Sequence, residues 1–124
     1  MAYNIEETQD IPYAAWLDSI PGFGRSRCYQ LVETAGSARN AYEMPDSDIA
    51  FLLGAKALAV WQQHRKLKEP NALYETYLHQ GISYVYYKSK EYPQKLRNIP
   101  DPPFGIYYKA VSYTHLTLPT NREV

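Results

Sequence analysis

Two arginines follow a glycine-rich turn near the start of the chain, in the stretch SIPGFGRSR. Gly22 and Gly24 flank Phe23, and Arg25 and Arg27 come next, in the first turn of a predicted helix. Glycines permit positive φ in a tight hairpin and leave the backbone N–H groups of the next helix open to a phosphate oxygen. The helix dipole adds about half a positive charge there, so arginines at this end favour a nearby anion. The turn therefore predicts contact with a nucleic-acid backbone phosphate, without base readout.

Two further observations bear on this turn. Helical hairpins in sterile-alpha-motif-like folds use the same turn only to pack two helices, with Ile20 and Phe23 in the core, and this alternative stays open. The stretch LLGAK is a degenerate second hairpin, with Gly54 before a helix that carries Lys56 in its first turn, although Ala55 replaces the second glycine. The candidate DNA-binding residues are Gly22, Phe23, Gly24, Arg25, Arg27 and Lys56.

The remaining reactive side chains predict neither a catalytic site nor a metal site. Cys28 lies on the apolar stripe of its helix, which favours a core thiol over a nucleophile. His64 and His79 fall in separate helices without a closely spaced carboxylate, and we expect both at the surface. The sequence contains no P-loop, no Gly-x-Gly-x-x-Gly fingerprint and no metal-ligand spacing. We therefore expect a protein that is not an enzyme and binds no cofactor.

A series of helices must position the turn. Asp10 is the predicted N-cap of the first helix, which has Pro12 in its first turn and ends near residue 19. The second helix ends at Gly36, a left-handed cap. Further helices are expected from Ser37 to Tyr42, over 46–53, over 55–69 and from Pro70 to Gly81.

The hydrophobic period changes from helix to strand at Gly81. ISYVYY, at 82–87, predicts a strand that is covered on both faces. A turn, a short helix and a proline-rich loop follow, and FGIYYK, at 104–109, predicts a second strand. Two strands alone do not make a stable sheet. We therefore expect a mainly α fold with a short β segment: a self-sufficient helical domain at 1–69, then a connecting helix and the start of a truncated sheet domain at 70–110.

Composition narrows the class of protein. The 124 residues carry a formal net charge of zero, so nucleic-acid binding would depend on local patches. The single cysteine excludes an intrachain disulfide framework. No apolar run approaches the roughly 20 residues of a membrane span, and the acidic N-terminus is unlike a signal peptide. We expect a cytoplasmic protein without a membrane partner.

The last stretch, 111–124, matches a translated sequencing adaptor. The mosaic-end adaptor of a transposase, with its primer extension, translates as Val-Ser-Tyr-Thr-His-Leu-Thr-Leu-Pro-Thr, which is the sequence of 111–120. The adaptor would also supply the last two bases of the Ala110 codon, so only the first base, a g, would be native. Every glycine codon begins with the same base. We therefore expect 111–124 to be a non-native tail, and the alternative is a genuine C-terminal extension.

Four stretches resemble the N-terminal part of the DNA-processing protein A (DprA/Smf) family, over about residues 12–110. They are WLDSIPGFGRSRCYQLVETAGSARNAYE, LHQGISYVYY, YPQKLRNIPDPP and IYYKA. The most specific element is the run from Tyr92-Pro93 through Leu96 to Ile99-Pro100-Asp101-Pro102-Pro103, followed by an apolar strand. The family usually has glycine where this chain has Ala110, which the shared codon explains.

The resemblance implies a sterile-alpha-motif-like, helix-hairpin-helix domain followed by the first strands of an extended Rossmann-like domain. It implies a DNA-processing function: members protect single-stranded DNA and load the RecA recombinase onto it during natural transformation. Their basic pocket, dimer surface and recombinase surface lie in the Rossmann-like part, which this chain only begins. We therefore expect weak, non-specific binding of single-stranded DNA here, with RecA binding and homodimerisation only in the full-length protein. Gly22, Gly24 and Arg25 carry over as secondary DNA contacts.

Two rival functions stay open. One is a helical protein-interaction domain, and the other is the front end of a Rossmann-like nucleotide-processing enzyme. A DNA module needs Arg25, Arg27 and Lys56 on one exposed face, whereas an interaction module needs an exposed apolar patch.

Overall fold

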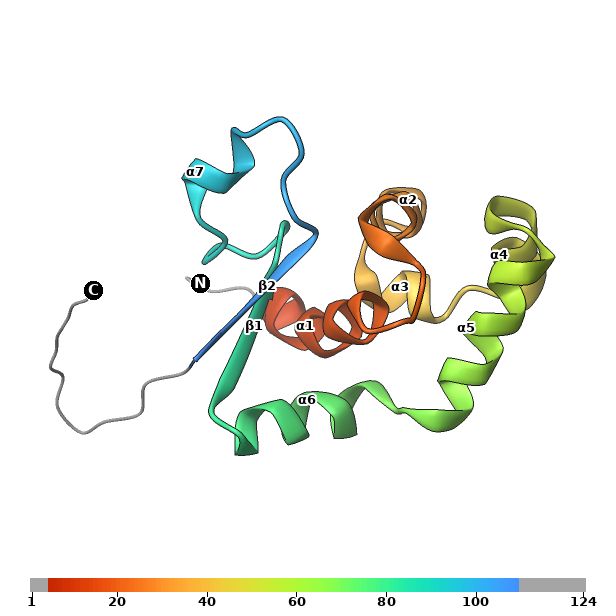
Figure 1. The fold of residues 1–124 in the computed structure, drawn as a ribbon, viewed down its shortest axis with the longest axis horizontal. Coiled ribbons are helices and arrows are strands. Elements are labelled where there is room, and N and C mark those ends of the chain that lie inside the picture. Colours follow the sequence, from red (N-terminus) through yellow and green to blue (C-terminus); the bar gives the residue numbers. More distant parts are fainter. Residues whose placement is uncertain (1–4, 110–124) are drawn as a thin grey trace, which may run out of the picture.

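The computed structural model describes residues 5–109, and the side chains of 9–109. The predicted adaptor-derived tail lies outside the described residues. The described part is mainly helical with a short β segment, as expected, and its two strands pair antiparallel (Figure 1). Its elements are α1 (Ile5–Asp18), α2 (Gly24–Ala35), α3 (Ala38–Tyr42), α4 (Asp46–Leu53), α5 (Ala55–Leu67), α6 (Pro70–His79), β1 (Ile82–Tyr86), α7 (Gln94–Arg97) and β2 (Gly105–Lys109). No helix in this range is long and apolar enough to cross a membrane.

The start of α1 differs from the sequence prediction. The helix begins at Ile5, so Asp10 lies inside it and is not its N-cap. The carboxylate of Asp10 instead accepts hydrogen bonds from the backbone N–H groups of Ala38, at 3.1 Å, and Arg39, at 2.7 Å. These groups open α3, where a helix lacks intrahelical acceptors. Asp10 therefore caps a helix, but one that is distant in sequence.

Three other predicted helix ends are confirmed, whereas α5 ends at Leu67 and α6 at His79, each two residues before the predicted end. Gly36 has φ 98° and donates its N–H to the carbonyl of Val32, which ends α2. The Ser37 side chain accepts a hydrogen bond from the N–H of Asn40 and caps α3. Pro70 opens α6. These ends depend on residues within a turn of each other, so a local pattern is enough to predict them.

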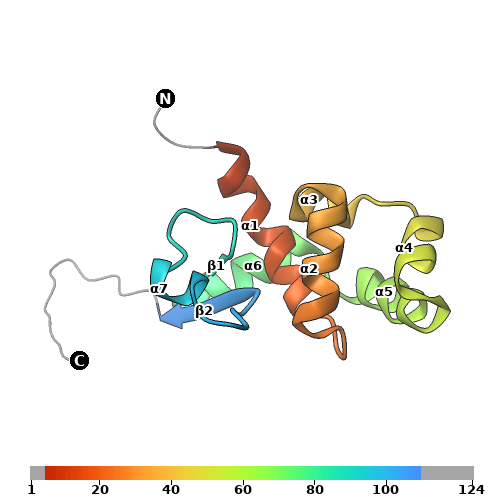
Figure 2. The same ribbon diagram turned by 90° about the horizontal axis from the view of Figure 1, so that it is seen from above.

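A single hydrophobic cluster runs through the described residues. Trp16 and Trp61 meet edge to face at its centre, with ring centroids 5.0 Å apart. The same cluster includes Tyr84, Tyr86 and Phe104, which come from the sheet and the loop before β2. Figures 1 and 2 show α1 between α2 and α3 on one side and the sheet on the other. The predicted boundary at residue 69 stays a prediction, and the core crosses it.

The sheet is a pair of antiparallel strands, with Tyr84 opposite Tyr107 and Tyr86 opposite Gly105. The consecutive residues 84–86 are all buried, so β1 is covered on both faces there, as predicted. Gly105 is required because a Cβ at this position would lie 1.8 Å from the Tyr84 hydroxyl oxygen. That hydroxyl donates a 2.8 Å hydrogen bond to Asp18, which ties β1 to the end of α1.

Candidate functional site

The predicted hairpin joins α1 to α2 through residues 19–23. Gly22 has φ 77° and Gly24 has φ 69°, so both adopt the positive φ that the sequence predicts. A Cβ at either position would meet no heavy atom within 4 Å. The glycines are therefore needed for the backbone conformation, and the space beside the turn is open to a ligand.

The first turn of α2 has neither a side-chain cap nor an acidic residue. Phe23 occupies the N-cap position in a helical conformation and makes no capping hydrogen bond. The first four N–H groups of a helix have no acceptor within the helix. Together with the helix dipole, these N–H groups favour an anion at this end of α2.

Both arginines lie at the hairpin. Arg25 is about half exposed, and its Nη2 lies 3.4 Å from a carboxylate oxygen of Asp101, in the loop between α7 and β2. Arg27 folds back across the turn, with its guanidinium carbon 5.6 Å from the ring centroid of Phe23 and Nη1 3.5 Å from the carbonyl oxygen of Gly22. The structure thus brings two cations to the uncapped end of α2.

Phe23 itself belongs to the core. Its side chain is only 4% exposed and stacks against the ring of Trp61, with centroids 6.3 Å apart. Ile20 is buried as well. The hairpin therefore packs two helices, as the alternative interpretation holds, and the buried ring of Phe23 is not accessible to a base. Only its backbone remains available to a phosphate.

In the folded chain, Lys56 lies away from Arg25 and Arg27. It is exposed in the first turn of α5, directly after Gly54, which has φ 95°. Figure 1 shows this end of α5 beside the end of α4, whereas the hairpin adjoins α1. The hairpin meets α5 further along, where Phe23 packs on Trp61. The structure does not bring Lys56 to the first hairpin.

The expectation for His64 was wrong, because its side chain is only 4% exposed. Its Nε2 lies 2.8 Å from the hydroxyl oxygen of Ser19, at the start of the hairpin turn. Burial lowers the pKa of His64, and the positive charge of Lys68 lowers it further. The signal was present in the sequence, since His64 follows Trp61 by three residues and so shares its helix face.

The burial of Cys28 and the exposure of His79 agree with the sequence prediction. Cys28 is buried, and burial together with the charge of Asp18 raises the pKa of its thiol to about 12. The thiolate needed for nucleophilic chemistry is therefore scarce at neutral pH. His79 is exposed, as expected. Among the side chains of 9–109, no group of three or more histidine, cysteine or acidic residues is arranged to hold a metal ion.

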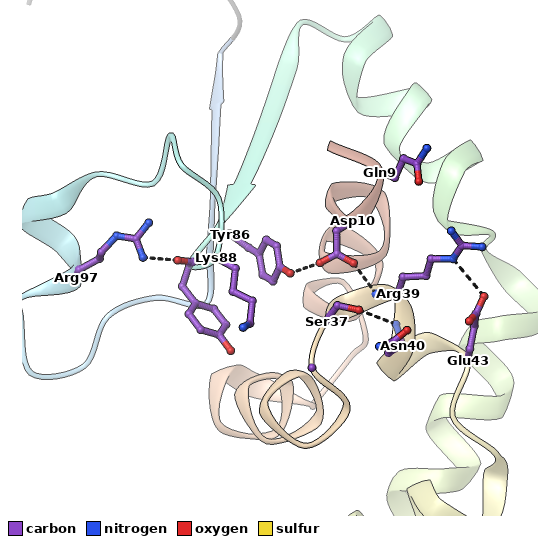
Figure 3. A pocket seen from close by; sticks show the side chains of 11 residues that line it. Gln9, Asp10, Ser37, Arg39, Asn40, Glu43, Tyr86, Lys88 and Arg97 are labelled. Carbon is purple, nitrogen blue, oxygen red and sulfur yellow. Dashed lines mark hydrogen bonds and ion pairs between the residues drawn. The ribbon is translucent and has the colours of Figure 1, made fainter. Parts of the chain in front are cut away.

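A polar hollow of about 790 Å³, which the sequence did not reveal, lies where α1, α3 and the end of β1 meet (Figure 3). Ser37 and Asn40 line it from the start of α3, and Lys88 reaches it from the segment after β1. The full lining is Gln9, Asp10, Gly36, Ser37, Arg39, Asn40, Glu43, Tyr86, Tyr87, Lys88 and Arg97. We call it the α3–β1 hollow.

The carboxylates of this hollow already have partners. Asp10 accepts two backbone N–H groups of α3 and the hydroxyl of Tyr86. Glu43 pairs with Arg39, whose Nε lies 3.3 Å away. Hydrogen bonds and an ion pair therefore offset both negative charges of the lining.

Two cations of the hollow lack such a counter-charge. Arg97 donates to the backbone carbonyls of Tyr87, at 2.5 Å, and Ser89, at 2.8 Å. The ammonium nitrogen of Lys88 lies 5.9 Å from the ring centroid of Tyr87. Within the described residues, no carboxylate lies within ion-pair distance of Lys88 or Arg97. The hollow therefore has an excess of positive charge.

A second, smaller hollow of about 260 Å³ lies between the hairpin and α5. Its lining is Pro21, Ala59, Val60, Gln63, His64 and Leu67. Leu67 is 67% exposed. The interaction-domain alternative requires an exposed apolar surface, and this hollow is the candidate for it.

Comparisons of this chain with family models, with curated proteins and with solved structures find no match. The likeness to the DNA-processing protein A family therefore depends on the sequence stretches quoted above.

Proposed function

We propose that this chain is a DNA-binding module without catalysis, from a protein similar to DNA-processing protein A. In this proposal the helices form a sterile-alpha-motif-like, helix-hairpin-helix unit, and β1 and β2 are the first strands of a Rossmann-like domain. The hairpin holds the backbone of single-stranded DNA weakly and without sequence preference. Protection of single strands, RecA loading and homodimerisation belong to the full-length protein, in the cytoplasm.

The observation that carries this proposal is the first turn of α2. Gly22 and Gly24 adopt positive φ beside open space, α2 begins without a cap, and Arg25 and Arg27 stand at the same end. A turn that only packed helices would need Ile20 and Phe23. Two arginines at the positive end of a helix are unfavourable without an anion, and the exposed ion pair of Arg25 with Asp101 and the weak contacts of Arg27 offset little of that cost. A bound phosphate accounts for both features.

A specific observation supports a second candidate, a protein-interaction domain. The apolar hollow beside Pro21 and the exposed side chain of Leu67 give α5 an apolar outer surface. Scattered exposed apolar side chains are normal in monomers, so this surface carries less weight than the hairpin.

The test is fluorescence anisotropy of a labelled single-stranded oligonucleotide across a salt series. Two or three phosphate contacts correspond to a log-log salt slope between about −1.4 and −2, with a dissociation constant on the order of 10⁻⁴ M or weaker. We expect the double variant Arg25→Ala/Arg27→Ala to reduce that slope by about one or more. Neither arginine is buried, so the fold should persist.

The matched control is Lys95→Ala/Lys109→Ala, which removes the same charge from exposed positions on α7 and β2. The control should change the salt slope by less than about half as much as the arginine double variant does. If both double variants weaken binding equally, binding reflects overall charge, and the hairpin is a packing device.

A further inference from the structure

We propose that the α3–β1 hollow binds one nucleotide unit of a single strand, with Lys88 contacting its phosphate. This site is separate from the hairpin. The inference rests on the proposed function only for the class of ligand, which is nucleic acid. The lining combines cations with hydrogen-bonding groups, and its volume of about 790 Å³ lies within the range of small-molecule sites.

The charges of the hollow select an anion. The carboxylate of Asp10 is used by α3 and Tyr86, and Glu43 is used by Arg39, so neither attracts a cation. Lys88 and Arg97 have no carboxylate partner within the described residues. A phosphodiester carries one negative charge, which offsets this excess.

The polar character of the lining selects the kind of anion. Sites for drug-like ligands are mostly apolar with a few polar groups, whereas nucleic-acid interfaces are polar and positively charged. In Figure 3 the Lys88 side chain extends into the space that faces Ser37 and Asn40. A phosphate at Lys88 would thus leave the sugar and base to face the hydroxyl of Ser37 and the amide of Asn40.

The hollow and the hairpin lie at opposite ends of one helix. Arg25 is in the first turn of α2, and Gly36 caps its last turn beside the hollow. A twelve-residue helix is about 18 Å long, a distance that a strand of a few nucleotides spans. The two sites can therefore be occupied separately or by one strand.

The test is a titration of the isotope-labelled chain with 2′-deoxyadenosine 5′-monophosphate, followed by amide NMR shifts. We expect saturable shifts at Ser37, Asn40 and Lys88, and no such shifts with deoxyadenosine, which lacks the phosphate. Lys88→Gln should weaken binding about tenfold, as for one lost charge-assisted hydrogen bond. The control Lys95→Gln, on α7 outside the lining, should change it less than twofold.

The outcomes separate this proposal from the hairpin. Binding that persists in Arg25→Ala/Arg27→Ala supports a site at the hollow, whatever the oligonucleotide assay shows for those arginines. No shifts at the three amides, or equal losses in Lys88→Gln and Lys95→Gln, would overturn the proposal. Equal binding of inorganic phosphate and the nucleotide would overturn the assignment to a nucleotide unit.

Discussion

The carboxylate of Asp101 lies 3.4 Å from the guanidinium of Arg25 and so joins the proline-rich loop to the first turn of α2. The Asp101 side chain is 81% exposed and that of Arg25 is 46% exposed. An exposed pair of this kind contributes at most about 1 kcal/mol, because water and salt screen it. A phosphate can therefore replace Asp101 as the partner of Arg25 at little cost.

Replacing Asp101 with Asn should strengthen binding of a labelled oligonucleotide severalfold at low salt. The substitution removes the charge that competes with phosphate for Arg25 and leaves a side chain of the same size. Anisotropy at 50 mM and 200 mM salt measures the effect, which should shrink as salt screens the charges. Glu75→Gln, an exposed change of the same charge on α6, is the control. If both variants bound the oligonucleotide more tightly by the same factor, Asp101 would not compete with phosphate for Arg25.

Replacing Gly24 with Val should reduce both the stability of the fold and DNA binding. Gly24 has φ 69°, and a β-branched residue resists this conformation at a cost of about 1–3 kcal/mol. The space around a Cβ is empty, so the cost comes from the backbone. Gly24→Asn should cost less, because asparagine tolerates the left-handed region. Urea denaturation measures the stability of the two variants. If Gly24→Val and Gly24→Asn lost the same stability, the cost would not come from the backbone conformation.

The burial of His64 predicts a stability that falls as the solution becomes acidic. Burial lowers the pKa of His64 in the folded chain below the 6.5 of the free side chain, so the unfolded chain takes up the proton first. The free energy of unfolding therefore decreases as the pH falls below about 6.5, where the histidine of the unfolded chain becomes protonated.

Urea denaturation between pH 7.5 and 5.5 tests this dependence. His64→Gln should show a flatter dependence than the unmodified chain, because carboxyl titrations are common to both. His79→Gln, which changes an exposed histidine, should keep the original slope. If His79→Gln flattened the dependence as much, His64 would not be its source.

Ending the chain after Glu69 should abolish the cooperative thermal transition, in contrast to the self-sufficient domain expected from sequence. Truncation removes Tyr84 and Tyr86 from the core and leaves Asp18 and Asp10 without the hydroxyl groups that donate to them. The loss of these two hydrogen bonds and the opening of the core both destabilise the fold. A chain ending at 109 is the control, and a cooperative transition of the shorter chain would establish the boundary at 69.

The sequence alone determined the features that depend on neighbouring residues. The left-handed cap at Gly36, the Ser37 cap of α3, the positive φ of Gly22 and Gly24, and the switch from helices to strands after Gly81 all follow from local patterns. Each involves a few consecutive residues, so the pattern contains the whole interaction.

Only the tertiary structure decided which distant groups meet. Asp10 caps a helix that begins 28 residues later, His64 faces a serine 45 residues earlier, and Tyr86 donates to a carboxylate 76 residues away. The α3–β1 hollow has the same origin, because α3 and the end of β1 contribute its lining separately. Such contacts form when the apolar faces of the helices and strands pack into one core. The order of residues along the chain specifies those faces but not which of them will meet.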